Sequence, residues 1–168
     1  MTIHDSPFPA RLKDLFDFEG KAELVGGRVV ELMPTSRIHN RVAGRIFKSL
    51  DDRALQLGIG EAYTDNIGFT LPAPIASGRE SFSPDASYFR GPFTSDPKKF
   101  IDGTPTFAVE VRSDSDSGPA GARAMAEKRD DYFEAGTLVV WDVDPDAETI
   151  FSGSSDKCVL CQVDRVNA

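Results

Sequence analysis

The chain has 168 residues, of which 40% are hydrophobic and 27% are charged, a composition typical of a globular domain. Its 19 basic and 27 acidic side chains give a net charge of −8, which excludes a protein that binds nucleic acid or anionic membrane with its whole surface. The longest unbroken apolar runs, residues 138–141 and 158–161, are far too short to span a bilayer. The N-terminus carries no apolar signal segment, and two cysteines give no disulfide framework. We therefore expect a cytoplasmic protein that makes no membrane contact.

The first elements in chain order are an N-terminal tail and a β-hairpin. We expect residues 1–14 to form the tail and residues 15–168 to form a single domain. Residues 22–25 and 28–32 are short β-type runs on either side of a Gly-Gly pair. This pattern predicts a hairpin with a tight turn.

A long helix follows the hairpin. Thr35 or Ser36 can cap its N-terminus, and Gly58 ends it after about Leu57. Apolar residues recur every four positions, so we expect one stripe of this helix to be buried. The stripe consists of Ile38, Val42, Ile46 and Leu50.

Three strand-like segments come next. Residues 66–71 precede a loop rich in proline, and residues 82–89 alternate between the two faces of an expected strand. Pro84 fits that strand only near its start or on a sheet edge. Residues 106–112 alternate in the same way, with an apolar face and a face of polar or small residues.

The last elements predict a parallel pair of strands and a final hairpin. A helix over residues 120–135 leads to an apolar strand over 137–143, and strand, helix, strand in this order is a βαβ crossover. Residues 148–151 and 157–163 then predict an edge hairpin around Gly153.

Asp85 and Glu110 are acids in the middle of strand-like segments, where acids are depleted. If the two strands are neighbours, the carboxylates lie close together and repel each other by about 4 kcal/mol at ~4 Å with an effective dielectric of about 20. A divalent cation, a shared proton or a basic neighbour must offset this repulsion, and Arg112 and Lys128 are the available cations. Two carboxylates and a lysine suit the hydrolysis of a phosphodiester assisted by Mg²⁺ or Mn²⁺.

The residues alone leave a simpler interpretation open for each of these positions. Asp85 and Glu110 can be solvated acids on the open face of an antiparallel sheet. His39 can be a helix-surface residue, Glu23 a solvated acid at a strand start, and Lys128 a solvated helix lysine.

The ordered motifs resemble a known family. Pro84-Asp85, a gap of 25 residues and Glu110-Val111-Arg112 resemble the PD-(D/E)XK nuclease signature. More narrowly, residues 15–146 resemble the Uma2 family of restriction-endonuclease-like proteins. The motifs that carry this resemblance are, in chain order, Glu23-Leu24-Val25-Gly26, His39, Ser83-Pro84-Asp85, Glu110-Val111-Arg112-Ser113, Glu127-Lys128-Arg129, Tyr132, Ala135-Gly136 and Val140-Trp141-Asp142-Val143-Asp144-Pro145.

The resemblance implies an α/β fold with a restriction-endonuclease-like core, in which helices flank a mixed central β-sheet and a β-hairpin lies at the N-terminus. It implies that Asp85 and Glu110 bind Mg²⁺, with Mn²⁺ as a substitute. Glu23 and His39 contribute to the same pocket, and Lys128 is the catalytic lysine. By the same resemblance the chain is expected to be a homodimeric DNA endonuclease.

Two rival functions remain at this point. The first is a catalytically silent nucleic-acid-binding or regulatory module that retains the nuclease fold, and the second is a structural or partner-binding protein without a metal site. Arg112 departs from the pattern because it stands where the parent motif has lysine. It can assist Lys128, bind a phosphate oxygen or crowd the site.

Basic residues concentrate on the long helix. Residues 37–50 contain four basic side chains and no acid, at spacings that place all four along one helical stripe. This stripe, together with Arg112, is the candidate surface for nucleic acid, and the alternative is a solvated helix face paired with acids elsewhere. Its members are Arg37, Arg41, Arg45 and Lys48.

Overall fold

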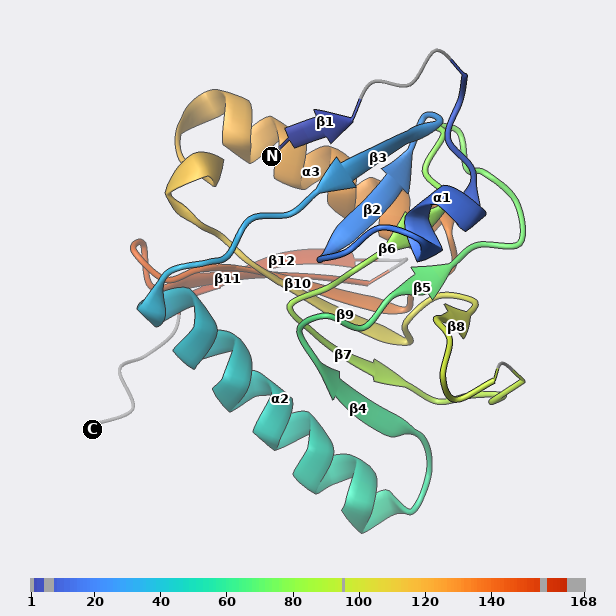
Figure 1. Ribbon diagram of the computed structural model, residues 1–168. Coiled ribbons are helices and arrows are strands. Elements are labelled where there is room, and N and C mark those ends of the chain that lie inside the picture. The colour runs from blue at the N-terminus through green and yellow to red at the C-terminus, as the bar shows by residue number, and fades with distance from the viewer. Residues whose placement is uncertain (1, 5–7, 95, 155–156, 163–168) are drawn as a thin grey trace.

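The computed structural model describes residues 2–4, 8–94, 96–154 and 157–162. Its helices and strands are β1 (Thr2–His4), α1 (Leu12–Phe16), β2 (Ala22–Val25), β3 (Arg28–Glu31), α2 (Arg37–Leu57), β4 (Glu61–Thr64), β5 (Phe69–Thr70), β6 (Ser81–Phe82), β7 (Ala86–Phe89), β8 (Ile101–Asp102), β9 (Phe107–Val111), the 3₁₀ turn η1 (Asp114–Asp116), α3 (Gly118–Glu134), β10 (Val139–Asp144), β11 (Thr149–Ser154) and β12 (Lys157–Gln162). A six-stranded sheet has the order β12-β11-β10-β9-β7-β4, and two three-stranded sheets have the orders β1-β3-β2 and β6-β5-β8 (Figure 1). No helix within these described ranges is long and apolar enough to cross a membrane.

The central sheet is mixed. Strands β9 and β10 run parallel and are joined by α3, which confirms the expected βαβ crossover. The other neighbouring pairs in this sheet are antiparallel. In this register Glu110 lies opposite Asp142, and Ala86 lies opposite Val109. Asp85 directly precedes Ala86, so the start of β7 and the middle of β9 bring both candidate acids to one part of the sheet.

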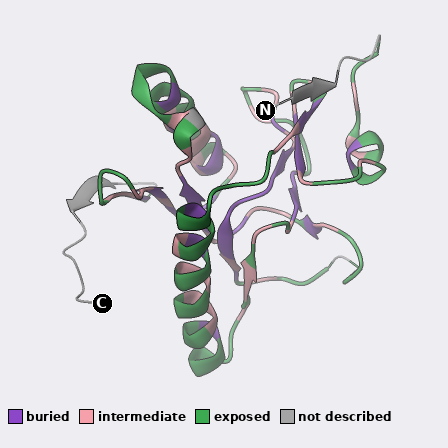
Figure 2. Cartoon of the chain, turned by 60° about the vertical axis from the view of Figure 1, so that its left-hand side comes forward, coloured by how far each residue is buried: buried purple, intermediate pink, exposed green. Residues whose placement is uncertain are grey.

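Helices cover both faces of this sheet. Val109 of β9 packs with Ala43 of α2 on one face, and Ala108 packs with Tyr132 of α3 on the other. Because successive side chains of a strand alternate between faces, Glu110 points towards α3. Figure 2 shows the buried strands between the two helices, whose outer surfaces are exposed. The expected fold class, a mixed sheet flanked by helices, is confirmed.

The N-terminal hairpin forms as expected. Gly26 and Gly27 have φ values of 56° and 69°, the left-handed conformation that a two-residue turn of type I′ requires at both positions. Strand β1 pairs with β3 and extends the hairpin to three strands. The backbone N–H of Leu24 donates a hydrogen bond of 2.7 Å to Oγ of Ser81, which ties the hairpin to β6.

Helix α2 begins after Ser36 and ends at Gly58, as expected, and its predicted stripe packs against the core through Val42, Ile46 and Leu50 but not at Ile38. Ile38 is 52% exposed, whereas its neighbour His39 is buried together with Ala43. The first turn of α2 lies beside polar groups of the sheet, so it turns a histidine inward where an apolar residue was expected.

The expectation of one strand over residues 82–89 is wrong. The run divides at Pro84, which has no N–H to donate, into β6 of a small sheet and β7 of the central sheet. On either side of Pro84, the N–H of Ser83 donates to Oε1 of Glu23 (2.9 Å) and the N–H of Asp85 donates to a carbonyl of β9 (3.0 Å). The change of sheet therefore places Asp85 at the junction of two sheets.

The shortest strands were predicted only in part. The expected strand over residues 66–71 is reduced to β5, and β4 and β8 were missed because neither carries a strong apolar alternation. The C-terminal hairpin is present, but Gly153 pairs with Cys158 inside it and does not form its turn.

Substitutions of the two interior glycines of the long helices test how closely these helices pack against their neighbours. Alanine at Gly121 of α3 would overlap the backbone carbonyl of Asp116 in η1, whereas the space around Gly44 of α2 is open. We expect Gly121→Ala to lower the free energy of unfolding by about 1–3 kcal/mol. Gly44→Ala is expected to raise it by about 0.5–1 kcal/mol through helix propensity. Urea denaturation measures both, and a stabilised Gly121→Ala would contradict the close contact between η1 and α3.

Candidate active site

Asp85 is buried at the start of β7 and three groups surround its carboxylate. Its Oδ2 accepts a hydrogen bond of 2.8 Å from the backbone N–H of Val111, and its Oδ1 accepts one of 3.1 Å from Nζ of Lys21. His39 arrives from α2 and places Nε2 3.2 Å from Oδ2, although the contact is not aligned as a hydrogen bond. Asp85 is therefore fixed by a backbone group of β9, by a side chain of α2 and by the lysine that directly precedes β2.

Glu110 is held by α3. Its Oε2 accepts a hydrogen bond of 2.9 Å from Nζ of Lys128, and its Oε1 accepts one of 2.6 Å from the hydroxyl of Tyr132. Lys128 and Tyr132 are four residues apart, so both lie on the side of the helix that faces β9. Both oxygens of the glutamate are occupied by donors from one helix.

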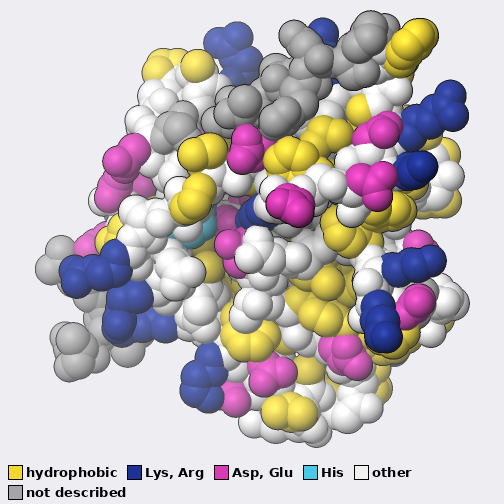
Figure 3. All heavy atoms as spheres, in the orientation of Figure 1, with side chains coloured by type: hydrophobic (Ala, Val, Ile, Leu, Met, Phe, Trp, Pro, Cys, Tyr) yellow, Lys and Arg dark blue, Asp and Glu magenta, His cyan; other side chains and the backbone are white. Residues whose placement is uncertain are grey.

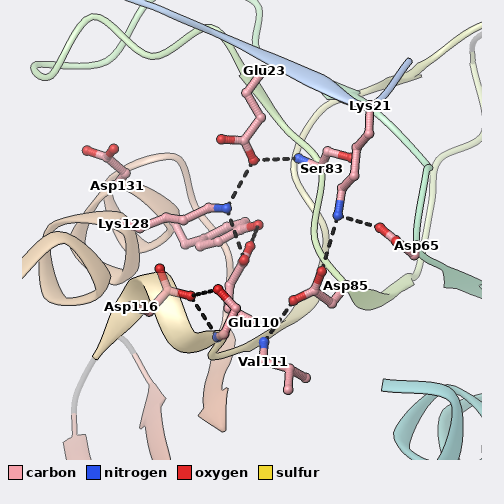
Figure 4. A network of polar contacts seen from close by, with 12 residues as sticks. Lys21, Glu23, Asp65, Ser83, Asp85, Glu110, Val111, Asp116, Lys128 and Asp131 are labelled. Atoms are coloured by element: carbon pink, nitrogen blue, oxygen red, sulfur yellow. Dashed lines mark hydrogen bonds and ion pairs between the residues drawn. The ribbon is translucent and has the colours of Figure 1, made fainter. Parts of the chain in front are cut away.

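Lys128 also reaches the N-terminal hairpin. Its Nζ lies 3.1 Å from Oε1 of Glu23, so the lysine bridges Glu23 and Glu110, as Figure 4 shows. The second oxygen of Glu23 accepts from Arg79 at 2.5 Å, and Arg79 also donates to Asp131 of α3 at 2.8 Å. The candidate site is a continuous network of buried charges that joins two sheets and a helix.

The structure brings together all five residues expected in the pocket. Glu23, His39, Asp85 and Glu110 are each less than 10% exposed, and Lys128 lies between two of them. The simpler interpretations, solvated acids on an open sheet and polar residues on helix surfaces, are wrong for these side chains. Their chemical roles remain predictions.

Burial and neighbouring charges separate the pKa values of the two acids. Burial alone would raise the pKa of Asp85, but the contacts with His39, Lys21 and the Val111 N–H hold it well below its usual range. Burial raises the pKa of Glu110 to about 7, and the negative charges of Asp85 and Glu23 act in the same direction, against the opposing charge of Lys128. One carboxylate stays ionised at neutral pH while its neighbour titrates there, a separation common at catalytic sites.

The donor set fits a small divalent cation. Asp85 and Glu110 offer the hard oxygens that Mg²⁺ and Mn²⁺ prefer, and Mg²⁺ is usually bound by one or two carboxylates together with water and substrate phosphate. Within the described part of the chain, no group of three or more His, Cys, Asp or Glu side chains is arranged to hold a metal ion. Asp85 and Glu110 would therefore hold the cation as a pair, with solvent or substrate completing its coordination.

Several residues of this network were not predicted from the sequence. Tyr132 was detectable, because it lies one helical turn after Lys128, and Lys21 lies two residues before Glu23, directly in front of the strand-like run. Arg79 and its partner Asp131 gave no periodic signal, since Arg79 lies in a loop.

Arg112 takes part in a different contact. Its guanidinium donates to both oxygens of the buried Asp142, at 2.7 and 2.8 Å, and also lies near Asp144. Arg129 of α3 pairs with the same Asp142. Arg112 therefore clamps β9 to β10, and its proposed contact with nucleic acid stays a prediction.

The basic stripe lies on the outer surface of α2. Arg37, Arg41, Arg45 and Lys48 are exposed, and Figure 3 shows basic side chains gathered at the lower left, where α2 runs in Figure 1. Lys48 pairs with Asp52, whereas the three arginines make no ion pair within the described residues. The stripe is on the opposite side of α2 from the buried face that carries His39.

Comparison with known proteins identifies the family. A family model described as "putative restriction endonuclease", Uma2, matches residues 10–164. The chain belongs to the Uma2 family. Among solved structures, the Uma2 chain is similar to a "putative nuclease belonging to DUF820" from Anabaena variabilis, with a TM-score of 0.70 and 16% identity over 92% of this chain and 86% of that one. No protein with curated annotation matches the chain.

The raised pKa of Glu110 predicts a distinctive pH dependence of stability in metal-free buffer. Between about pH 4.5 and 7 the folded protein holds a proton on Glu110 that the unfolded chain has lost, so this stabilisation disappears as the pH rises through that range. We expect the free energy of unfolding of the wild type, relative to Glu110→Gln, to fall by about 2–3 kcal/mol from pH 4.5 to 8. Denaturation at several pH values measures the difference, with Glu127→Gln on the exposed side of α3 as the control. A difference that does not change with pH would contradict the raised pKa.

Proposed function

We propose that this Uma2 chain is a Mg²⁺-dependent endonuclease that hydrolyses phosphodiester bonds of DNA. The observation that supports the proposal most strongly is the burial of Asp85 and Glu110, two acids that each have a lysine partner: Lys21 contacts Asp85, and Lys128 contacts Glu110. Burying charges costs several kcal/mol per ion even after pairing, and an apolar cluster of similar volume is often at least as stable. A network of this kind in a small α/β domain is therefore better explained by function than by stability.

In the proposed hydrolysis each side chain of the candidate site has a separate role. Asp85 and Glu110 hold the divalent cation, which when bound supplies Lewis-acid polarisation of the phosphoryl oxygen and a more acidic bound water. Lys128 places a positive charge beside Glu110, where it stabilises the negative charge that develops on the phosphate. Tyr132 and Glu23 position Glu110 and Lys128, and His39 faces Asp85 from the other side of the sheet.

A catalytically silent nucleic-acid-binding module is the second candidate. It is favoured by the observation that every oxygen of Asp85 and Glu110 already has a basic or hydrogen-bond-donating protein partner. Such a module would retain the fold and the basic helix and would not cleave nucleic acid. A cleavage assay separates the two functions.

DNA is proposed to approach along α2. Within the described residues the three arginines of this helix make no ion pair, so they form a local positive surface on a chain of net charge −8. At physiological salt, charges beyond roughly 8 Å are largely screened. A phosphate near α2 therefore interacts mainly with these arginines.

We further propose that the protein acts in the cytoplasm and that it is a homodimer. A dimer has the two sites that are needed to cut both strands of a duplex in one binding event. Sedimentation at the concentrations of the assay tests the dimer.

The cleavage assay uses supercoiled plasmid with Mg²⁺ or Mn²⁺. We expect Asp85→Ala, Glu110→Gln and Lys128→Met each to lower the rate of nicking by at least about 100-fold, as expected for the loss of a metal ligand or a charge-stabilising group. Asp130→Ala, an exposed acid on α3, serves as the control and is expected to keep the wild-type rate.

Circular dichroism of each variant shows whether it has folded. Equal nicking rates in the folded wild type and the folded site variants would contradict the nuclease assignment, because the nicking would then come from a contaminant. Binding without cleavage in every protein would favour the silent module.

The basic helix predicts the salt dependence of binding. We expect Arg37→Gln/Arg41→Gln/Arg45→Gln to weaken binding to duplex DNA at low salt and to reduce the slope of log K against log salt concentration by about 2–3. Lys98→Gln/Lys99→Gln, in an exposed loop, is the matched control. Fluorescence anisotropy measures both, and an unchanged slope in the triple variant would place the DNA on another surface.

A further inference from the structure

Lys21 contacts one of the two carboxylates that would hold a metal ion. Its Nζ lies 3.1 Å from Oδ1 of Asp85, one of the two proposed ligands, and forms a second ion pair with Asp65. The Lys21 side chain is only 13% exposed. Figure 4 shows the ammonium between the two aspartates, on the opposite side of the site from Lys128.

The charges of the network leave an excess of negative charge. With every carboxylate ionised and His39 neutral, the five carboxylates exceed the three lysine and arginine side chains by two charges, which one divalent cation would neutralise. The carboxylates are Glu23, Asp65, Asp85, Glu110 and Asp131, and the cations are Lys21, Arg79 and Lys128.

Lys21 is the cation of this set with a partly exposed partner. Lys128 is held between two buried carboxylates, and Arg79 is held between Glu23 and Asp131. The second partner of Lys21, in contrast, is 34% exposed. Lys21 also borders a hollow of about 270 Å³, lined by Asn66, Gly68 and Phe100 among others, which gives its side chain room to move.

We infer that Lys21 is a built-in counter-ion that keeps Asp85 paired in the metal-free protein and competes with the divalent cation for it. A buried carboxylate without a partner is costly, so the lysine keeps Asp85 ordered before a cation arrives. An ammonium in contact with Oδ1 repels a divalent cation at the same oxygen, so binding of the cation would require Nζ to give up this contact and to keep only its ion pair with Asp65. Lys21 thereby lowers the metal affinity of the site. This inference rests on the proposed function, because it assumes that Asp85 is a metal ligand.

Calorimetric titration of Mn²⁺ into the full chain tests the competition without relying on cleavage. We expect Lys21→Met to bind Mn²⁺ about tenfold more tightly than the wild type, since one contact charge at the ligand is removed. Lys21→Arg keeps the charge and is expected to bind with wild-type affinity. Lys13→Met, an exposed lysine of α1, is the control for the loss of a remote charge and is expected to match the wild type as well.

Thermal unfolding gives a second readout. Without metal, Lys21→Met leaves Asp85 with one partner fewer, so we expect this variant to melt at a lower temperature than the wild type in EDTA. Added Mn²⁺ is expected to raise its melting temperature by more than that of the wild type. Lys21→Gln keeps a side chain that can donate to Asp85 without carrying charge. It serves in place of Lys21→Met if that variant does not fold.

The outcomes separate this inference from the proposed function. Mn²⁺ binding that is lost in Asp85→Ala but is no tighter in Lys21→Met and Lys21→Gln than in the wild type would overturn the competition and leave the metal site standing. Tighter binding by Lys21→Arg would overturn it too, because the charge would then be irrelevant. Absence of Mn²⁺ binding in the wild type and in every Lys21 variant would overturn the metal site and this inference together.

Discussion

The bridge that Lys128 makes between Glu23 and Glu110 is the contact on which the site depends. It connects the N-terminal hairpin, the middle of β9 and α3, three parts of the chain that do not adjoin in sequence. Each carboxylate is buried, so neither can remain ionised without this ammonium or an equivalent cation. The position of the hairpin over the sheet and the chemistry of Glu110 are therefore set by the same side chain.

The fold supplies the geometry that this bridge needs. The parallel pair β9 and β10 requires a crossover, and the crossover helix α3 must return over the face of the sheet to which Glu110 points. The change of sheet at Pro84 places Asp85 beside β9 at the same level, where a backbone N–H of that strand fixes it. Regular secondary structure positions Glu110 and Lys128, whereas an interruption of regular structure positions Asp85.

The sequence predicted the elements with strong periodicity and missed those without it. The Gly-Gly hairpin, α2 and the βαβ unit follow from turn chemistry, capping and alternation, which are local properties of the chain. The short strands β4 and β8, and the short extent of β5, depend on partners far away in sequence, so local patterns do not reveal them. The same distinction between local patterns and long-range contacts applies to the residues of the candidate site. The motif spacing identified Asp85, Glu110 and Lys128. Residue type alone did not decide whether these side chains are buried or solvated. Arg79 was missed because it lies in a loop, where the sequence shows no periodic pattern.

The burial of several acids in ion pairs explains how an acidic chain can still attract a phosphate. Several of its acids are buried in ion pairs and do not repel an approaching phosphate as exposed acids would, because lysine and arginine partners neutralise them at contact distance. The net charge of −8 therefore overstates the repulsion that nucleic acid meets at α2, where the arginines are exposed and within a Debye length of a bound phosphate. Net charge describes the whole molecule, and binding depends on the few charges that remain both exposed and unpaired.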